Sequence, residues 1–150
     1  MHMYRRFTAM IATSTVLMLP LMYLNTYAAD HVFFSETRTY MALVMGAAMA
    51  LIMLAFMRGM LANPRFNAVV VAAAIAVFAG ALWLVRSQAS VDQVSYMKAM
   101  IPHHSIAILT SERAHISDPR VRRLADNIIE TQRREIAERK ALISELEAAP

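Results

Sequence analysis

Residues 40–60 read YMALVMGAAMALIMLAFMRGM. Arg58 is the one charged residue in this stretch, which is about as long as the roughly 20 residues that a helix needs to cross a bilayer. In lipid a helix satisfies its own backbone hydrogen bonds, so a long apolar run is stable there as a helix. The stretch therefore predicts a membrane-spanning helix over residues 39–61.

Two more apolar runs, residues 7–29 and 66–85, contain no charged residue. Hydrophobic residues make up 58% of the 150 residues and charged residues only 17%, and most of the charged residues follow residue 85. This division predicts an all-α membrane protein, with three transmembrane helices in a domain at residues 1–86 and a soluble part at residues 87–150. The first run could instead be a cleaved signal, but its length favours an anchor.

The positions of the arginines predict the orientation of the spans. Arginines precede the first run and flank the link between the second and third runs, at Arg5, Arg6, Arg58 and Arg65. The link between the first and second runs carries Asp30, Glu36 and a single arginine. Because cytoplasmic loops are enriched in Lys and Arg, we expect the N-terminus in the cytoplasm. The part after the third run is then expected outside a bacterial-type inner (plasma) membrane, as a periplasmic or extracellular domain.

The chain has no cysteine and 13 methionines. The absence of cysteine excludes disulfides and thiolate metal sites. Five methionines recur at every fourth residue of the second run, at Met41, Met45, Met49, Met53 and Met57. This stripe is either flexible filler between packed helices or a ladder of thioethers that passes Cu(I), and filler is the commoner role of methionine. In its three spans and its MxxxM pattern the chain resembles the Ctr copper transporters, whose N-terminus lies outside the cytoplasm.

After residue 90 the pattern becomes that of two amphipathic helices. The first is expected over residues 91–115 with Ser90 as its N-cap, and its apolar seam contains Val94, Met97, Ile101, His104 and Ile108. Ser117-Asp118-Pro119 predicts the start of a second helix, which reaches about Glu147. Its expected seam follows Val121, Ala125, Ile128, Gln132, Glu135, Arg139, Leu142 and Leu146, widened by Leu124, Ile129, Ile136 and Ile143. The short link predicts an antiparallel hairpin, which we expect to dimerise into a four-helix bundle because two helices cannot bury both seams.

The stretch YMKAMIPHHS, residues 96–105, places two methionines and two histidines around a proline. Folding the hairpin about Ser117 sets Met100 level with Glu135 and His104 level with Thr131, where the second helix turns polar. Thioether and imidazole groups suit Cu(I) or Ag(I), and a bend at Pro102 would aim both histidines at one centre. The alternative is a pair of ordinary histidines on a kinked helix. We predict a metal site for copper, as Cu(I), formed by Met97, Met100, His103, His104 and Glu135.

A second candidate is the pair Glu112-x-x-His115, which has the spacing used by di-iron carboxylate bundles. The same folding of the hairpin sets Glu112 level with Arg123, which favours an ion pair, and a histidine at a helix C-terminus suits the helix dipole. We therefore prefer a structural role for this pair. His31, in the first link, is expected on the same side of the membrane as the hairpin, but nothing in the sequence requires it at the site.

Three short motifs resemble those of a known family: M100-I-P-H-H104, then D118-P-R-V-R-x-L-A-D126, then Q132-x-x-E-I136. They resemble the MIPHH-motif family of unknown function, which is grouped with ferritin-like helical bundles and whose CopM-like members bind copper. The resemblance covers about Val91–Leu146, and the three-span arrangement is similar to the membrane-anchored branch of that family. It implies copper or silver binding by Met97, Met100, His103 and His104. Ser105, Thr110 and Arg139 stand where many members have glutamine or methionine, which thins the set of sulfur ligands.

These features predict a membrane-anchored, outward-facing protein that binds Cu(I) or Ag(I) in copper tolerance or delivery. Capture and hand-over of an ion need no bond-making chemistry, so we expect no enzyme, no catalytic residue and no nucleic-acid partner. The expected partners are the lipid bilayer, the metal ion and a second copy of the chain. The alternatives are a copper transporter that uses the methionine stripe, a ferritin-like oxidase that uses Glu112 and His115, and a structural bundle without a ligand.

Overall fold

A computed structural model describes residues 2–148 of the chain, which form helices and connecting segments without a strand. The elements in order are α1 (His2–Leu21), the short 3-10 helix η1 (Ala29–His31), α2 (Glu36–Phe56), α3 (Pro64–Ser87), α4 (Gln93–Arg113) and α5 (Pro119–Ala148). They divide into two compact units. We call residues 2–22 and 37–90 the three-helix unit, and residues 23–36 and 91–148 the hairpin unit. The all-α fold class is confirmed.

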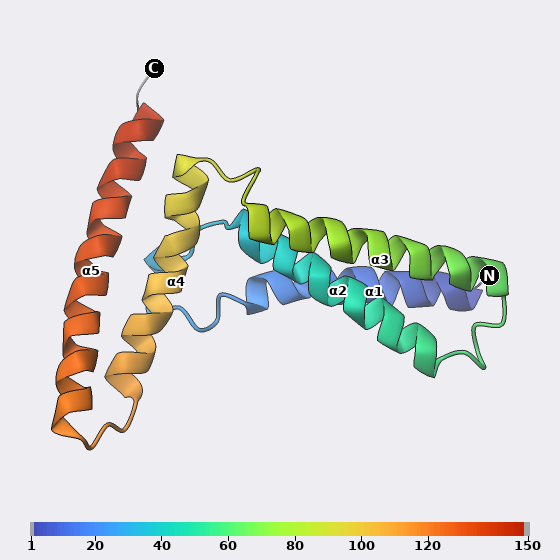
Figure 1. Cartoon of the computed structure of the whole chain (residues 1–150), viewed down its shortest axis with the longest axis horizontal. Coiled ribbons are helices and arrows are strands. Elements are labelled where there is room, and N and C mark those ends of the chain that lie inside the picture. Colours follow the sequence, from blue (N-terminus) through green and yellow to red (C-terminus); the bar gives the residue numbers. More distant parts are fainter. Residues whose placement is uncertain (1, 149–150) are drawn as a thin grey trace. The chain divides into compact units, whose positions relative to one another are not determined.

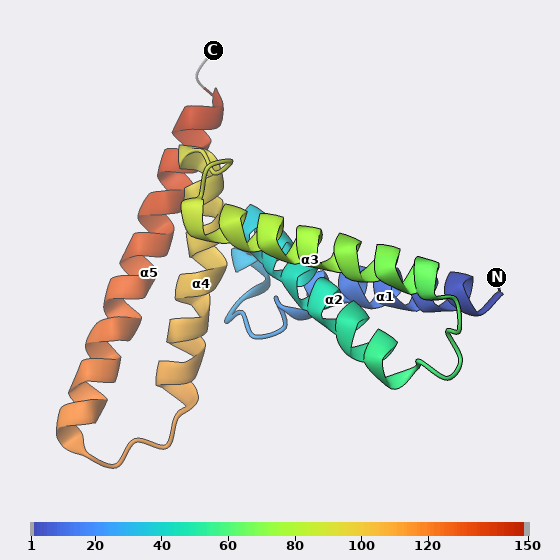
Figure 2. The same cartoon turned by 45° about the vertical axis from the view of Figure 1, so that its right-hand side comes forward.

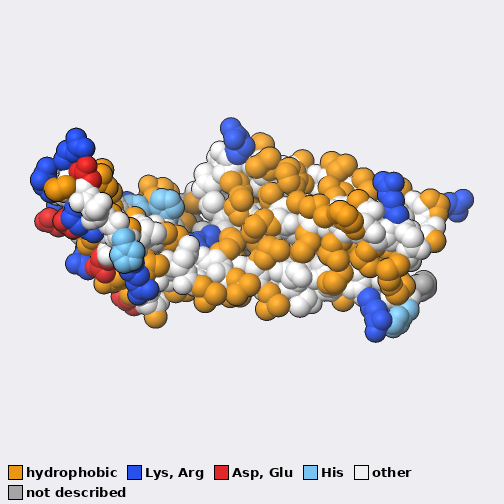
Figure 3. Space-filling view, turned by 90° about the horizontal axis from the view of Figure 1, so that it is seen from below, with side chains coloured by type: hydrophobic (Ala, Val, Ile, Leu, Met, Phe, Trp, Pro, Cys, Tyr) orange, Lys and Arg blue, Asp and Glu red, His pale blue; other side chains and the backbone are white. Residues whose placement is uncertain are grey.

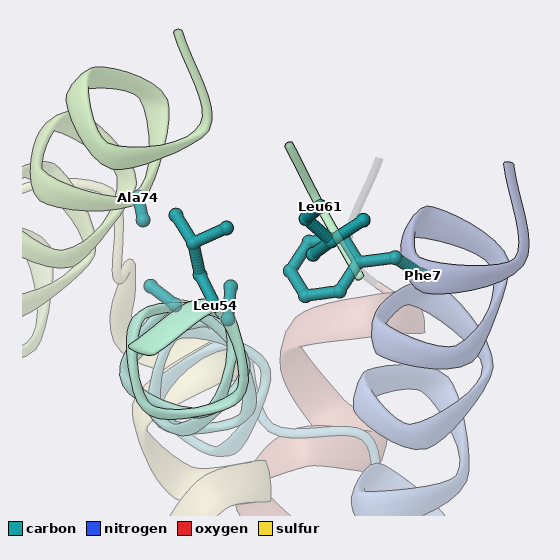
Figure 4. Packing of buried hydrophobic residues seen from close by; sticks show 6 residues of the cluster. Phe7, Leu54, Leu61 and Ala74 are labelled. Carbon is teal, nitrogen blue, oxygen red and sulfur yellow. The ribbon is translucent and has the colours of Figure 1, made fainter. Parts of the chain in front are cut away.

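In the three-helix unit, α1, α2 and α3 run alongside one another in alternating directions, as both views show (Figures 1 and 2). Their shared core consists of Phe7, Ala47, Ala50, Leu54, Leu61 and Ala74. Figure 4 shows the Leu54 side chain directed toward Ala74 of α3, and Leu61 against the ring of Phe7 of α1. Because these residues come from every helix and from the link between α2 and α3, their burial holds the three helices together.

One end of the three-helix unit is closed by hydrogen bonds around Tyr4 of α1. Its hydroxyl accepts a hydrogen bond from the Asn63 amide at 2.9 Å and donates one to Asn67 Oδ1 at 3.0 Å. Asn63 also caps α3, because its side chain accepts hydrogen bonds from the amides of Arg65 and Phe66. Pro64 follows at the first position of the helix, where a missing amide hydrogen costs nothing. The start of α1 therefore lies beside the link between α2 and α3.

Among residues 2–148, two helices are long and apolar enough to cross a membrane, by their length and composition. They are α2 and α3, with mean hydropathies of 2.1 and 2.6. The bounds of these two helices agree within a few residues with the predicted spans 39–61 and 66–85. The predicted first span, 7–29, is too long, because α1 ends at Leu21. Pro20 in its last turn cannot donate an amide hydrogen bond, and the chain leaves the helix there. As observed, α1 begins at His2 and so includes Arg5 and Arg6, which lower its mean hydropathy.

In the hairpin unit, α4 and α5 lie antiparallel and side by side in both views, as the sequence predicts (Figures 1 and 2). The seam of α4 is confirmed, since Met97, Ile101, His104 and Ile108 are buried. Its N-cap is Asp92 and not the predicted Ser90. The Asp92 carboxylate accepts a hydrogen bond from the Ser95 amide at 2.7 Å, which also lowers the pKa of Asp92.

The buried row of α5 differs from the predicted seam by a rotation of about one residue. Its buried side chains are Ala125, Ile136 and Ile143, with Ile129 packed beside them. Four residues of the predicted seam or its flank are instead exposed, namely Val121, Leu124, Leu142 and Leu146. The physical reason is that the isoleucine row buries more apolar surface against α4 than the row that contains Gln132, Glu135 and Arg139, at about 25 cal/mol per Å². That polar row lies half-buried at the edge of the interface.

Residues 23–36, which join α1 to α2, pack against the hairpin, and we call them the strap. Phe33 of the strap packs on the apolar cluster between α4 and α5. At its far end Glu36 accepts a hydrogen bond from the Ser95 hydroxyl at 3.2 Å, and in its middle Asp30 pairs with Lys140 at 2.6 Å. The sequence interpretation placed this segment within the membrane domain 1–86, whereas the structure groups it with residues 91–148.

Gly46 of α2 lies so close to α1 that an added Cβ would overlap the Thr15 side chain. We expect Gly46→Leu to lower the free energy of unfolding of the three-helix unit by about 1–3 kcal/mol through overpacking. Gly80→Leu is the matched control, because a Cβ at Gly80 meets nothing within 4 Å. Thermal unfolding of the two variants in detergent tests this, and equal midpoints would contradict the close approach of α1 and α2.

Candidate metal centre

The MIPHH stretch lies on α4, which continues as a helix through Pro102. Pro102 is fully buried, and its neighbours differ in their surroundings. His103 is exposed, whereas His104 is 8% exposed. The two rings are 5.8 Å apart between centroids and tilted by 57°. Consecutive residues of a helix point in different directions, so only His104 reaches the interface with α5.

His104 is held by two charged side chains of α5. Its Nδ1 lies 3.0 Å from Glu135 Oε2, and Arg139 lies 3.1 Å from the same carboxylate oxygen. The Arg139 guanidinium is also 3.4 Å from His104 Nδ1. A carboxylate this close favours the tautomer in which Nδ1–H donates to Glu135, and the lone pair on Nε2 is then available to a ligand.

The surroundings of His104 keep its imidazole neutral. Burial lowers the pKa of His104 below its ordinary value, and the nearby Arg139 guanidinium lowers it further. The Glu135 carboxylate opposes this shift by attraction, while His103 adds a smaller lowering. A neutral imidazole is the form that binds metals.

The predicted methionine ligands lie in different surroundings from one another. Met97 is 8% exposed and belongs to the apolar cluster with Ile101 and Ile136, while Met100 is half-buried. Within residues 2–148, no group of three or more His, Asp and Glu side chains is close enough to hold a metal ion. The predicted site therefore depends on the two methionines that the prediction includes, and not on these groups alone.

The predicted register of the hairpin is displaced. The prediction set His104 level with Thr131, whereas its side chain contacts Glu135 and Arg139. These contacts lie about one and two turns further along α5 than predicted. Similarly, Glu112 forms its ion pair with Arg133 and not with Arg123, so the predicted partner was wrong while the ion-pair interpretation is confirmed. Side chains of a helix lean toward its N-terminus, so in an antiparallel pair a side chain of α4 meets one that starts further along α5 than the backbone register alone gives.

Sequence reasoning left out the contact that the strap makes beside His104. Ser105 is fully buried, and its hydroxyl accepts a hydrogen bond from the Tyr27 amide at 2.7 Å. His31 Nδ1 lies 2.9 Å from the same hydroxyl oxygen. Burial lowers the pKa of His31, Asp30 partly offsets this, and Lys140 adds to the lowering. The available signal was Ser105 itself, a small hydroxyl on the buried side of α4 that needs a polar partner.

Ser105→Ala removes the acceptor for the Tyr27 amide. We expect a loss of about 1 kcal/mol in the stability of the strap, because a part-buried hydrogen bond is lost. Thr110→Ala is the control, since the exposed Thr110 hydroxyl bonds only within its own helix. Hydrogen exchange of the Tyr27 amide is the measurement, and unchanged protection in Ser105→Ala would show that this bond does not hold the strap.

The charges around His104 predict the direction of two pKa changes. Arg139→Gln should raise the pKa of His104, and Glu135→Gln should lower it. Glu138→Gln, which changes an exposed carboxylate on α5, should leave it unchanged. NMR titration of the His104 ring in the full chain tests the three variants, and a raised pKa in Glu135→Gln would contradict the assignment.

The lowered pKa of His104 also makes the stability of the hairpin unit depend on pH. An unperturbed imidazole has a pKa of about 6.5, and the pKa of folded His104 lies below its ordinary value. As the pH falls through that range the unfolded chain binds more protons than the folded chain, so the hairpin unit is destabilised by acid and keeps its full stability above pH 6.5 or so.

Comparison with known proteins gives a family match over the residues of the hairpin. Residues 87–150 match the family model described as "Domain of unknown function (DUF305)". The chain is also 39% identical over 66 residues to an uncharacterized protein of Acanthamoeba polyphaga mimivirus, and the match covers 43% of each protein. The chain thus spans less than half the length of this relative, and no solved structure matches it. The expectation of a domain of unknown function is confirmed, and residues 87–150 are the part of the chain that the DUF305 match covers.

Proposed function

We propose that the protein is anchored in a membrane by its three-helix unit and binds Cu(I) or Ag(I) in its hairpin unit. The membrane placement is supported by the surfaces of α2 and α3. Only 28% and 11% of their most apolar windows are buried within the protein. Exposed apolar surface of that extent is unfavourable in water and stable against lipid.

The proposal includes α1 as a third membrane segment with the N-terminus in the cytoplasm. Its support is that α1 packs along α2 at Gly46 and shares the core through Phe7. Four arginines stand near one end of the unit, at Arg5, Arg6, Arg58 and Arg65. An excess of arginine marks the cytoplasmic side, so the other end of the unit, from which the hairpin unit continues, faces outward.

The observation that carries the metal proposal is the His104–Glu135 pair. A carboxylate that fixes one ring nitrogen while the other stays free is the arrangement by which metal-binding histidines are oriented. In the proposed site His104 Nε2 is a ligand, and Glu135 orients the ring rather than binding the ion. Met100 and Met97 lie one and two turns before His104 on α4 and supply thioether ligands for a soft ion. His103, which is exposed, would take part in capture and hand-over.

A second copy of the chain is the proposed partner of the hairpin unit. The exposed apolar row of α5 supports this, since Val121, Leu124, Leu142 and Leu146 are each at least 40% exposed. Two hairpins that cover these rows would form a four-helix bundle, with tolerance or delivery of copper as the function of the assembly.

The transporter alternative has less support. Met53 and Met57 pack beside the core of the three-helix unit. Of the other methionines of the stripe, Met45 and Met49 are half-buried and Met41 is exposed. This is what filler between helices would do. The oxidase alternative is weakened because Glu112 is already paired with Arg133.

The test is Cu(I) binding by the full chain in detergent, in competition with a chromogenic chelator of known affinity. We expect His104→Gln to abolish binding and Glu135→Gln to weaken it about 10- to 100-fold, the usual effect of removing an outer partner of a histidine ligand. Met100→Leu should also weaken binding. His115→Gln is the matched control at an exposed histidine of the same unit and should bind like the unaltered chain.

Equal binding by the unaltered chain and His104→Gln would overturn the proposed site. A loss of binding or of copper movement in a Met45→Leu, Met49→Leu double variant, with His104→Gln unaffected, would favour the transporter. No binding by any variant would favour a structural bundle without a ligand.

A further inference from the structure

A cavity of about 410 Å³ lies where α2 ends and α3 begins in the three-helix unit. Its volume is within the range of small-molecule sites in proteins, which is about 300–1,000 Å³. Leu51 and Ala55 of α2 and Ala68 and Val71 of α3 form apolar walls, and Arg58 is the one charged residue of the lining. The combination of apolar walls with a single cation at the end of a helix is that of a site for an amphipathic anion.

The charge of Arg58 is not neutralised within its own unit. Residues 2–22 and 37–90 contain no aspartate and no glutamate, so no carboxylate of this unit can pair with Arg58. Arg58 is exposed, and Tyr4 brings the start of α1, with Arg5 and Arg6, beside the link that holds it. The guanidinium of Arg58 is therefore available to an external anion at this end. Figure 3 shows blue Lys and Arg side chains at the right-hand end of the mostly orange surface of this unit.

We propose that this cavity binds an anionic phospholipid, with the phosphate on Arg58 and part of an acyl chain against the walls of α2 and α3. Arginine suits phosphate because its planar guanidinium can donate two parallel hydrogen bonds. The apolar walls favour a lipid over a free phosphate ion, because a phosphate ion has no apolar group that could contact them. Basic pockets between membrane helices on the cytoplasmic side are places where anionic headgroups bind. The inference rests on the proposed membrane placement of the unit, and it is independent of the metal proposal.

The experiment uses the full chain, stripped of lipid in detergent and titrated with phosphatidylglycerol or with phosphatidylcholine of the same acyl chains. Native mass spectrometry counts the bound lipids. We expect a preference for phosphatidylglycerol at one site, and inorganic phosphate alone should compete weakly. Arg58→Gln should weaken phosphatidylglycerol binding about fivefold, as expected for one arginine near a lipid surface.

Two matched pairs of variants separate the site from general effects. Ala68→Leu fills the cavity and should weaken binding, whereas Ala72→Leu, at an exposed residue of α3 outside the cavity, should not. Arg86→Gln removes a cation at the other end of α3 and should also bind like the unaltered chain. Equal losses in Arg58→Gln and Arg86→Gln, or equal binding of both lipids, would overturn the proposal.

Flotation of the same proteins with liposomes distinguishes failure of the site from failure of the membrane placement. If the unaltered chain floats but shows no lipid preference, only the lipid site is overturned. If it does not float, the membrane placement and the lipid site are both overturned, while the metal-binding test is unaffected.

Discussion

The hairpin unit depends on the burial of isoleucines between two antiparallel helices. Ile101 and Ile108 of α4 are fully buried and belong to one cluster with Ile136 and Ile143 of α5. Each such side chain contributes about 1.5–3 kcal/mol when it is removed from water. These residues set the register of the hairpin, and the register decides which residues of α5 meet the histidines of α4.

The polar residues at the edge of that interface follow from the same register. With the isoleucine row buried, Glu135 and Arg139 lie half-buried beside His104 and pair with it and with each other. A buried polar group is tolerated when it is hydrogen-bonded, and burial of an imidazole favours its neutral form. The proposed metal ligand is therefore prepared by packing: the carboxylate orients the ring, and the apolar surroundings keep it unprotonated at neutral pH.

The strap gives the hairpin unit a third layer of contacts. It leaves α1 at Leu21, covers Ser105 with the Tyr27 amide and His31, and ends at α2. Tyr27 and His31, which contact α4 beside the candidate metal centre, thus belong to the segment that connects α1 to α2. The three-helix unit differs in that α2 and α3 bury little of their apolar surface, and the membrane placement proposed for the unit rests on this property.

The sequence by itself determined most of the helices, because apolar length and amphipathic spacing are local properties. It predicted α2, α3 and the antiparallel hairpin, the seam of α4, and His104 and Glu135 as residues of interest. Only the tertiary structure decided that α1 stops at Leu21, that the isoleucine row of α5 is buried, and that Glu135 meets His104 rather than Met100. It also decided that His31 reaches Ser105. These outcomes depend on which surfaces bury the most apolar area together, and that comparison between distant segments cannot be made from one segment alone.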